Sequence, residues 1–238
     1  RLLAAMVEWL RRHGATPIEI DTDGIYFVPP ASAARDMEAF RAAFAASLPE
    51  GIEIEFDGEY RSMYSYKMKN YALLGKNGEV VIKGAALKSR GLEPFLRDFL
   101  RELIRCRLEQ READMAALKA SFEDDIRERR WPIARLAKTE TLQDSPETYA
   151  AKRRGNRRSR SAVYELALAS GREYRAGDQL SYYVTGSRKN VAVHEAARRV
   201  SDWSPDARDE NVPYYLAKLE ALYAKFGVTG VQPELDLG

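Results

Sequence analysis

Strand patterns give way to helical patterns near Gly91, and this change determines the class of fold. Before Gly91, short β-branched and aromatic runs between turn residues predict strands at 17–20, 25–28, 52–57, 60–74 and 79–83. Helices are expected in that part at 2–13 and 32–47. After Gly91, apolar residues recur at helical spacing over 93–129, 161–169, 191–200 and 213–226. Because strands and helices are segregated rather than alternating, we expect an α+β fold with antiparallel strands.

The part after Gly91 also contains segments that are not helical. Residues 144–161 are rich in Arg, Ser, Gly and Asn and are expected to form a loop, and 179–184 a strand. We therefore expect a sheet domain at 1–90, a mainly helical domain with short strands at 91–227, and a flexible tail at 228–238. The chain begins at Arg1 within a helical pattern, so we expect a piece of a longer protein.

Charge is distributed unevenly along a chain whose formal net charge is +2. Residues 1–60 hold five Lys and Arg against eleven Asp and Glu, residues 61–90 seven against one, and residues 127–160 eleven against four. This order indicates an acidic or metal centre beside a surface for a polyanion, although charge runs also cover ordinary solvated faces. The single cysteine, Cys106, excludes an internal disulfide. The sequence has no run of about 18 apolar residues, so it predicts no membrane-spanning helix. We expect a cytoplasmic protein with no membrane partner.

Two carboxylates lie at the tip of the first expected hairpin, in the turn Asp21-Thr22-Asp23-Gly24. Carboxylates held this close repel each other unless a divalent cation lies beside them, and Mg²⁺ suits such a pair. The alternative is an ordinary polar turn in which Gly24 supplies the backbone freedom.

A second family shares part of this pattern. Ile18–Gly24 resembles the nucleophile motif of haloacid-dehalogenase-like phosphatases, except that Ile25 stands where that motif has Thr. That fold needs alternating strands and helices, which the sequence does not predict. The phosphatase stays open as an alternative at this point.

The basic segment at 61–90 combines cations with aromatic residues and glycine. Lys69 and Tyr71 alternate, so we expect them on the same face of a strand, where a cation meets a phosphate and a ring packs beside a sugar or base. Gly84, after Lys83, would let the backbone approach a phosphate closely. The alternative is a solvated sheet edge protected by lysines.

These motifs resemble those of the family B DNA polymerases. Asp21-Thr22-Asp23 is similar to their metal-binding hairpin, and Lys69-Asn70-Tyr71 to their Lys-x-Tyr element. Similar segments follow in the family's order: Lys83-Gly84 with Lys88 and Arg90, Arg135–Leu142, Gly177–Val184, and Asp209 with Tyr214-Tyr215. The chain thus resembles the C-terminal part of a bacterial-type family B polymerase, with the second half of the palm at 1–90 and the thumb at 91–227.

The resemblance implies a DNA-directed DNA polymerase that acts on primer–template DNA and deoxynucleoside triphosphates. Asp21 and Asp23 would be catalytic carboxylates in a site for two Mg²⁺ ions, Asp23 as the main metal ligand and Asp21 as a weaker or outer-shell one. Glu55 would be a further carboxylate, and the remaining ligands would lie outside this chain. The residues expected to hold the duplex are Lys69, Tyr71, Lys83, Gly84, Lys88 and Arg90. Such an enzyme would be nucleoid-associated in the cytoplasm.

The sequence departs from the family pattern at three places. Glu19-Ile20 replaces the usual Tyr-Gly, Gly24 replaces Ser, and Gly91 replaces Asp. The family's first metal-binding strand and its nucleotide-binding fingers are absent, so we expect the chain alone to be inactive. A non-catalytic DNA-binding module that has kept a palm-like hairpin is the other alternative.

The tail contains a second resemblance. Gln232, Leu235 and Leu237 resemble the peptides by which bacterial polymerases bind the sliding clamp, although Gly238 stands where those peptides end in Phe. An extended peptide with two apolar anchors can fill a pocket on a partner. The alternative is an ordinary frayed terminus.

Overall fold

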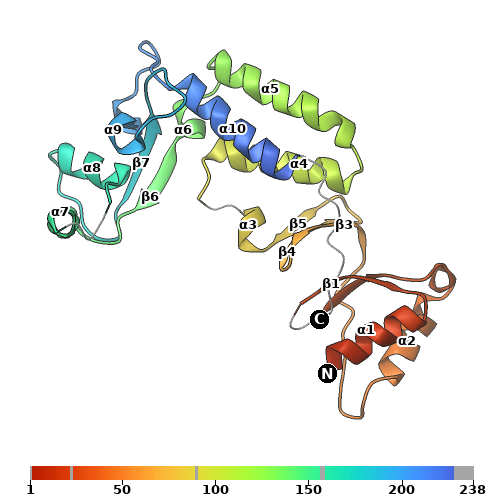
Figure 1. Cartoon of the computed structure of the whole chain (residues 1–238). Helices are drawn as coiled ribbons and strands as arrows, with labels where there is room; N and C mark the ends of the chain where they lie inside the picture. The colour runs from red at the N-terminus through yellow and green to blue at the C-terminus, as the bar shows by residue number, and fades with distance from the viewer. Residues whose placement is uncertain (1, 22–23, 89–90, 156–158, 228–238) are drawn as a thin grey trace. The chain divides into compact units, whose positions relative to one another are not determined.

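The computed structural model describes residues 2–21, 24–88, 91–155 and 159–227 (Figure 1). These residues form two compact units: the first unit ends at Lys88, and the second unit comprises the rest up to Gly227. Strands paired within the described part are all antiparallel, and helices accompany them in both units. The predicted mixture of helices and antiparallel strands is therefore confirmed.

The first unit begins with a helix packed on a hairpin. Helix α1 (Leu2–Arg12) precedes strands β1 (Thr16–Ile20) and β2 (Ile25–Val28), which pair antiparallel. An apolar stripe on α1 packs with residues of the hairpin and of helix α2 (Met37–Ala46). The 3₁₀ turn η1 (Ala31–Ala34) precedes α2, and Asp36 caps α2 by accepting a hydrogen bond from the Ala39 amide at 2.9 Å. The helix expected at 32–47 is therefore two elements.

A separate three-stranded sheet completes the first unit. Strands β3 (Tyr60–Lys67), β4 (Asn70–Gly75) and β5 (Val80–Lys83) pair antiparallel in the order β3-β4-β5, and the short helix α3 (Ala85–Lys88) follows. The central strand β4 is buried along most of its length. The sequence predicted one segment at 60–74, whereas the structure has two strands there, joined by a tight turn at Met68 and Lys69.

The strand expected at 52–57 is absent from the described structure. Its alternating pattern does turn Ile54 and Phe56 toward the core beside Phe44. The segment nevertheless has no strand pairing among the described residues. Alternation alone therefore predicted which side chains face inward, but not the ladder of hydrogen bonds that defines a strand.

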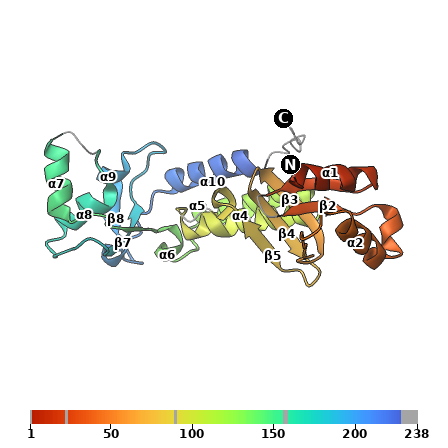
Figure 2. The same ribbon diagram turned by 90° about the horizontal axis from the view of Figure 1, so that it is seen from below.

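Three helices form one layer of the second unit. Helices α4 (Pro94–Leu108), α5 (Met115–Arg127) and α10 (Val212–Phe226) pack side by side (Figures 1 and 2). Their contact is largely aromatic: the ring centroids of Phe99 and Phe122 are 5.1 Å apart. The prediction of continuous helix over 93–129 is wrong, because Gln110 adopts a φ of +56° that ends α4, and the 3₁₀ turn η2 (Glu112–Asp114) leads into α5.

The remainder of the second unit is built around a small sheet. Strands β6 (Lys138–Thr141), β7 (Gln179–Val184) and β8 (Ala197–Arg199) pair antiparallel in that order. The short elements beside them are α6 (Ile133–Leu136), α8 (Ala162–Ala169), α9 (Val193–Ala196) and η3 (Val200–Asp202). Strand β7 confirms the strand predicted at 179–184, whereas the helix predicted at 191–200 is replaced by α9, β8 and the start of η3.

The loop predicted at 144–161 contains a helix, α7 (Pro146–Arg154). Ser145 caps it by accepting from the Thr148 amide at 3.3 Å, and three basic residues lie in its last turn, where they complement the helix dipole. Tyr149 is fully buried and stacks on Tyr164 with ring centroids 4.4 Å apart. One buried ring thus anchors a helix whose other residues are mostly polar.

Within the described chain, no helix is long and apolar enough to cross a bilayer.

Candidate nucleic-acid interface

The β1–β2 turn presents the expected carboxylate. The amide of Asp21 donates to the carbonyl oxygen of Gly24 at 2.9 Å, which closes the turn, and the Asp21 side chain is 26% exposed. Asp23 lies outside the described residues. In the part of the chain that the structure describes, no three His, Cys, Asp or Glu residues gather closely enough to hold a metal ion. Glu55 is exposed on the unpaired segment after α2.

A lysine from a different part of the sequence lies beside this turn. Lys69 occupies the turn between β3 and β4 with a φ of +61°, and its Nζ is 3.4 Å from Oδ1 of Asp21. The lysine side chain is 55% exposed, so the ion pair itself stabilises the fold by only about 0–1 kcal/mol. Its importance is geometric, because it brings a basic side chain next to the carboxylate turn.

Tyr71 is not on a shared strand face with Lys69, so that expectation is wrong. Lys69 belongs to the turn, whereas Tyr71 lies in β4 and is only 4% exposed. The Tyr71 ring packs on Tyr26 at 5.2 Å between centroids, and burial, aided by the Tyr26 hydroxyl, raises the pKa of Tyr71 well above its usual value. Tyr71 therefore supports the strand beneath the turn from inside the fold.

Gly84 packs against the same turn. Its φ is +88°, and a Cβ at this position would lie 2.2 Å from the carbonyl oxygen of Lys69. Asn70 completes the contact: its Oδ1 accepts from the Ala86 amide at 2.9 Å, and its Nδ2 donates to the Met68 carbonyl oxygen at 3.0 Å. In this structure, glycine is needed at position 84 for packing of the protein on itself, whereas the sequence suggested approach to a phosphate.

The remaining expected duplex contacts flank Gly84. Lys83 and Lys88 are exposed, and neither has an ion pair among the described residues. Arg90 lies outside the described residues, as do the tail residues Gln232, Leu235 and Leu237. The structure thus brings together the lysine turn, the end of β5 and the carboxylate turn, within the first unit.

Glu19 is the residue that sequence reasoning missed. It lies on β1 two residues before Asp21 and is 5% exposed. Its Oε2 accepts from the Ser65 hydroxyl at 2.8 Å, and its Oε1 accepts from the Lys69 amide at 3.0 Å. The sequence does contain a signal for this role. Pro17 and Glu19 lie two positions apart on the same buried face of β1, and an acidic side chain on a buried face requires hydrogen-bond partners.

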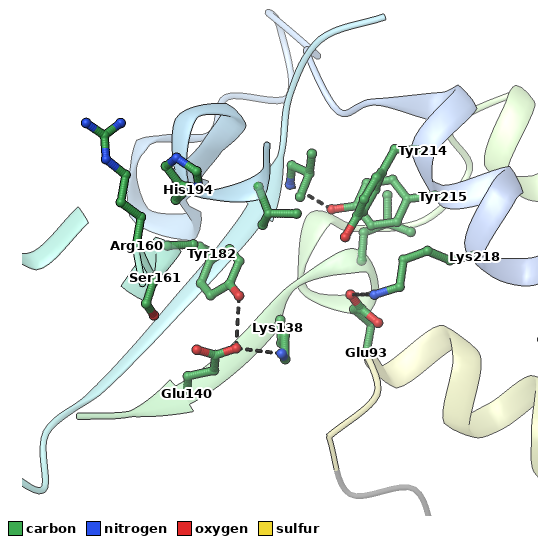
Figure 3. Close-up of a pocket in the computed structure, with 14 residues that line it drawn as sticks. Glu93, Lys138, Glu140, Arg160, Ser161, Tyr182, His194, Tyr214, Tyr215 and Lys218 are labelled. Atoms are coloured by element: carbon green, nitrogen blue, oxygen red, sulfur yellow. Dashed lines mark hydrogen bonds and ion pairs between the residues drawn. The ribbon is translucent and has the colours of Figure 1, made fainter. Parts of the chain in front are cut away.

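The second unit contains a separate polar cavity of about 300 Å³ (Figure 3). Glu93 pairs with Lys218 on one side, and on the other Glu140 pairs with Lys138 at 2.5 Å and accepts from the Tyr182 hydroxyl at 3.0 Å. The residues come from α10, from β6 and β7, and from the start of α4. Two acid–base pairs therefore line a space between the helical layer and the small sheet of this unit.

The later sequence motifs meet at this cavity and hold α10 on the sheet. The amide of Val184 donates to the Tyr215 hydroxyl at 2.8 Å, and the Tyr183 hydroxyl donates to Asp209 at 2.7 Å. Burial, aided by the charge of Glu93, raises the pKa of Tyr214 to about 12. Tyr215 is therefore held by a hydrogen bond within the protein, whereas Tyr214 lines the cavity near Glu93.

Comparison with known proteins gives one consistent family. DNA polymerase family B matches residues 17–225. Two curated relatives are a DNA polymerase of Methanocaldococcus jannaschii, 23% identical over 222 residues, and DNA polymerase 1 of Aeropyrum pernix, 24% identical over 220 residues. Each match covers 88% of this chain, which spans 13% and 22% of the length of these relatives.

A solved structure shows the same fold. The family B DNA polymerase from the hyperthermophilic archaeon Pyrobaculum calidifontis aligns with a TM-score of 0.72 and 20% identity, covering 96% of this chain and 29% of that one. All three relatives are archaeal, so the expected bacterial type is not confirmed. The phosphatase alternative fails, because the family match is to a polymerase and the described sheets are antiparallel. The chain belongs to DNA polymerase family B.

Proposed function

We propose that this chain is the second half of the palm and the thumb of a DNA-directed DNA polymerase whose remaining parts lie elsewhere in a longer protein. The observation that carries the proposal is the position of Lys69 beside Asp21, with Nζ and Oδ1 3.4 Å apart. A polymerase must hold the primer end close to its metal-binding carboxylates. A lysine and a carboxylate that lie 48 positions apart in sequence, yet in contact in the fold, suit that task.

The donor chemistry of the β1–β2 turn fits a divalent cation. Asp21 is a partly exposed carboxylate, a hard oxygen donor of the kind that Mg²⁺ prefers, and a bound cation would displace the Lys69 ammonium from it. Asp21 and Asp23 would hold Mg²⁺, with Glu55 as a weaker candidate; the bound metal would stabilise charge on the attacking primer hydroxyl and on the leaving pyrophosphate. The other ligands would come from the longer protein.

Four basic residues would hold the primer–template duplex: Lys69, Lys83, Lys88 and Arg90. Contacts of this kind reach phosphates and fix the register of the duplex without reading its sequence. Tyr71 would act indirectly, since its buried ring supports the strand that carries the turn. Gly84 would act in the same way, by allowing β5 to pack closely on the Lys69 turn.

The second unit would act as the thumb, which grips the duplex away from the reaction. Its helical layer and small sheet are joined by the tyrosine contacts described above, so they would move as one body. Deoxynucleoside triphosphates would be substrates of the complete enzyme, working with DNA in the nucleoid. Gln232, Leu235 and Leu237 remain the candidates for contact with a sliding clamp.

The test is Lys69→Ala in the full-length polymerase, with Lys76→Ala as a matched control. Lys76 is an exposed lysine of the same unit that pairs with Glu59. Lys69→Ala is expected to weaken primer–template binding uniformly across sequences. It should also reduce the slope of log binding constant against log salt concentration by about 1, which corresponds to one phosphate contact. The control Lys76→Ala should change neither quantity. Equal affinity for both variants would refute the proposed grip. Duplex binding without metal-dependent incorporation by the full-length protein would favour the non-catalytic module instead.

A further inference from the structure

Glu19 is a buried carboxylate whose two oxygens both bind groups from the β3–β4 hairpin. Oε2 takes the Ser65 hydroxyl at 2.8 Å and Oε1 takes the Lys69 backbone amide at 3.0 Å. Its partners lie 46 and 50 residues further along the chain, so the contact forms only when the two hairpins are docked.

The turn that Glu19 contacts is one that needs support. Lys69 has a φ of +61°, a region of backbone conformation that residues other than glycine seldom adopt because the Cβ crowds the backbone there. Such a conformation persists only where the surroundings fix it. Gly84 and Asn70 hold the turn from the β5 side, and Glu19 holds it from the β1 side.

We propose that Glu19 is a positioning residue that fixes the Lys69 turn to the strand carrying Asp21. It acts through the backbone amide of Lys69, so it sets where the lysine side chain begins without touching the ammonium group. The distance between the duplex-holding cation and the metal-binding carboxylates is thereby set inside the fold. The inference rests on the proposed function, because it assigns Lys69 to the duplex.

Glu19 is not suited to be a further metal ligand. Both of its oxygens already accept hydrogen bonds, and the residue is 5% exposed. Each oxygen keeps a further lone pair, but burial keeps these away from solvent, where Mg²⁺ and the waters that it retains would lie. Its role is therefore to orient the neighbouring groups, and the two roles respond differently to substitution.

The experiment compares Glu19→Ala and Glu19→Gln, each in the Lys69 and the Lys69→Ala background of the full-length polymerase. Glutamine keeps both contacts, since its carbonyl oxygen can accept from the Lys69 amide and its NH₂ can donate to Ser65. We expect Glu19→Ala to weaken primer–template affinity about three- to tenfold, as loss of one placed phosphate contact does, and Glu19→Gln to stay within about twofold. In the Lys69→Ala background, Glu19→Ala should have no further effect. Thermal melting of each variant monitors folding.

The outcomes separate this inference from the proposed function. If Lys69→Ala weakens binding but Glu19→Ala does not, the inference fails and the proposed function stands. If Lys69→Ala itself has no effect, both fail. A metal ligand would lose turnover in Glu19→Gln at unchanged duplex affinity, and a general loss of fold would weaken binding equally in both backgrounds; either result overturns the positioning role. Glu59→Ala, which removes an exposed carboxylate of the same unit, is the control and should match the parent enzyme.

Discussion

Gly84→Ala is expected to destabilise the first unit more than any comparable glycine substitution in its turns. The new Cβ would lie 2.2 Å from the Lys69 carbonyl oxygen and 2.4 Å from Oδ1 of Asn70. Adopting the positive φ costs about 1–2 kcal/mol, and moving the β3–β4 turn aside costs about 1–3 kcal/mol more. The expected loss in free energy of unfolding is therefore about 2–5 kcal/mol.

Gly78→Ala is the matched control for this substitution. Gly78 also has a positive φ, of +84°, but nothing lies within 4 Å of a Cβ built there. It should lose only the conformational part, about 1–2 kcal/mol. Urea unfolding of the chain measures both losses, and hydrogen exchange of the β4 amides assigns them to the first unit. Equal losses for the two variants would refute the close packing of Gly84 on the Lys69 turn.

The proposed function leads to three further expected outcomes. The 238-residue chain should bind primer–template DNA with an affinity that falls steeply with salt, yet should not extend a primer; extension by this chain alone would contradict the division of the site. Asp23→Asn in the full-length polymerase should abolish incorporation while leaving duplex affinity within about twofold, and near-normal turnover would show that the hairpin is not the metal site. A peptide of residues 228–238 should bind the sliding clamp in a titration, and the double variant Leu235→Ala, Leu237→Ala should not; equal behaviour of both would leave an ordinary terminus.

Local patterns predicted the elements whose signals are contained in a few residues. The first hairpin and β7 were predicted because alternation and turn residues occur within each short segment. Helix α7 was missed because a single buried ring, Tyr149, and the Ser145 cap stabilise a sequence that is otherwise basic and polar. The break after α4 was missed because Gln110 carries no turn signature, and its positive φ is set by the packing of α5 back on α4.

The candidate site could likewise be predicted only in part: its residues were identified from motifs, but the contacts between them were not. Motifs identified Asp21 and Lys69 separately, but no spacing rule predicts that two residues from different hairpins come within 3.4 Å. The turn at Lys69 was read as continuous strand because a positive φ at lysine is uncommon and depends on contacts made later in the chain. Glu19 was counted only as a departure from a family pattern, since its partners are visible only in the folded structure.

The helical layer of the second unit is discontinuous in sequence, and this affects the order in which it can form. Helices α4 and α5 follow each other directly, whereas α10 returns to them only after residues 128–211 have been made. Closing a loop of that length costs about 4 kcal/mol in chain entropy, because the cost grows with the logarithm of loop length. The loop must close before Phe95 of α4 can contact Tyr215 of α10. During synthesis the apolar faces of α4 and α5 therefore wait uncovered for α10, and folding of this layer is expected to be slow for its helical content.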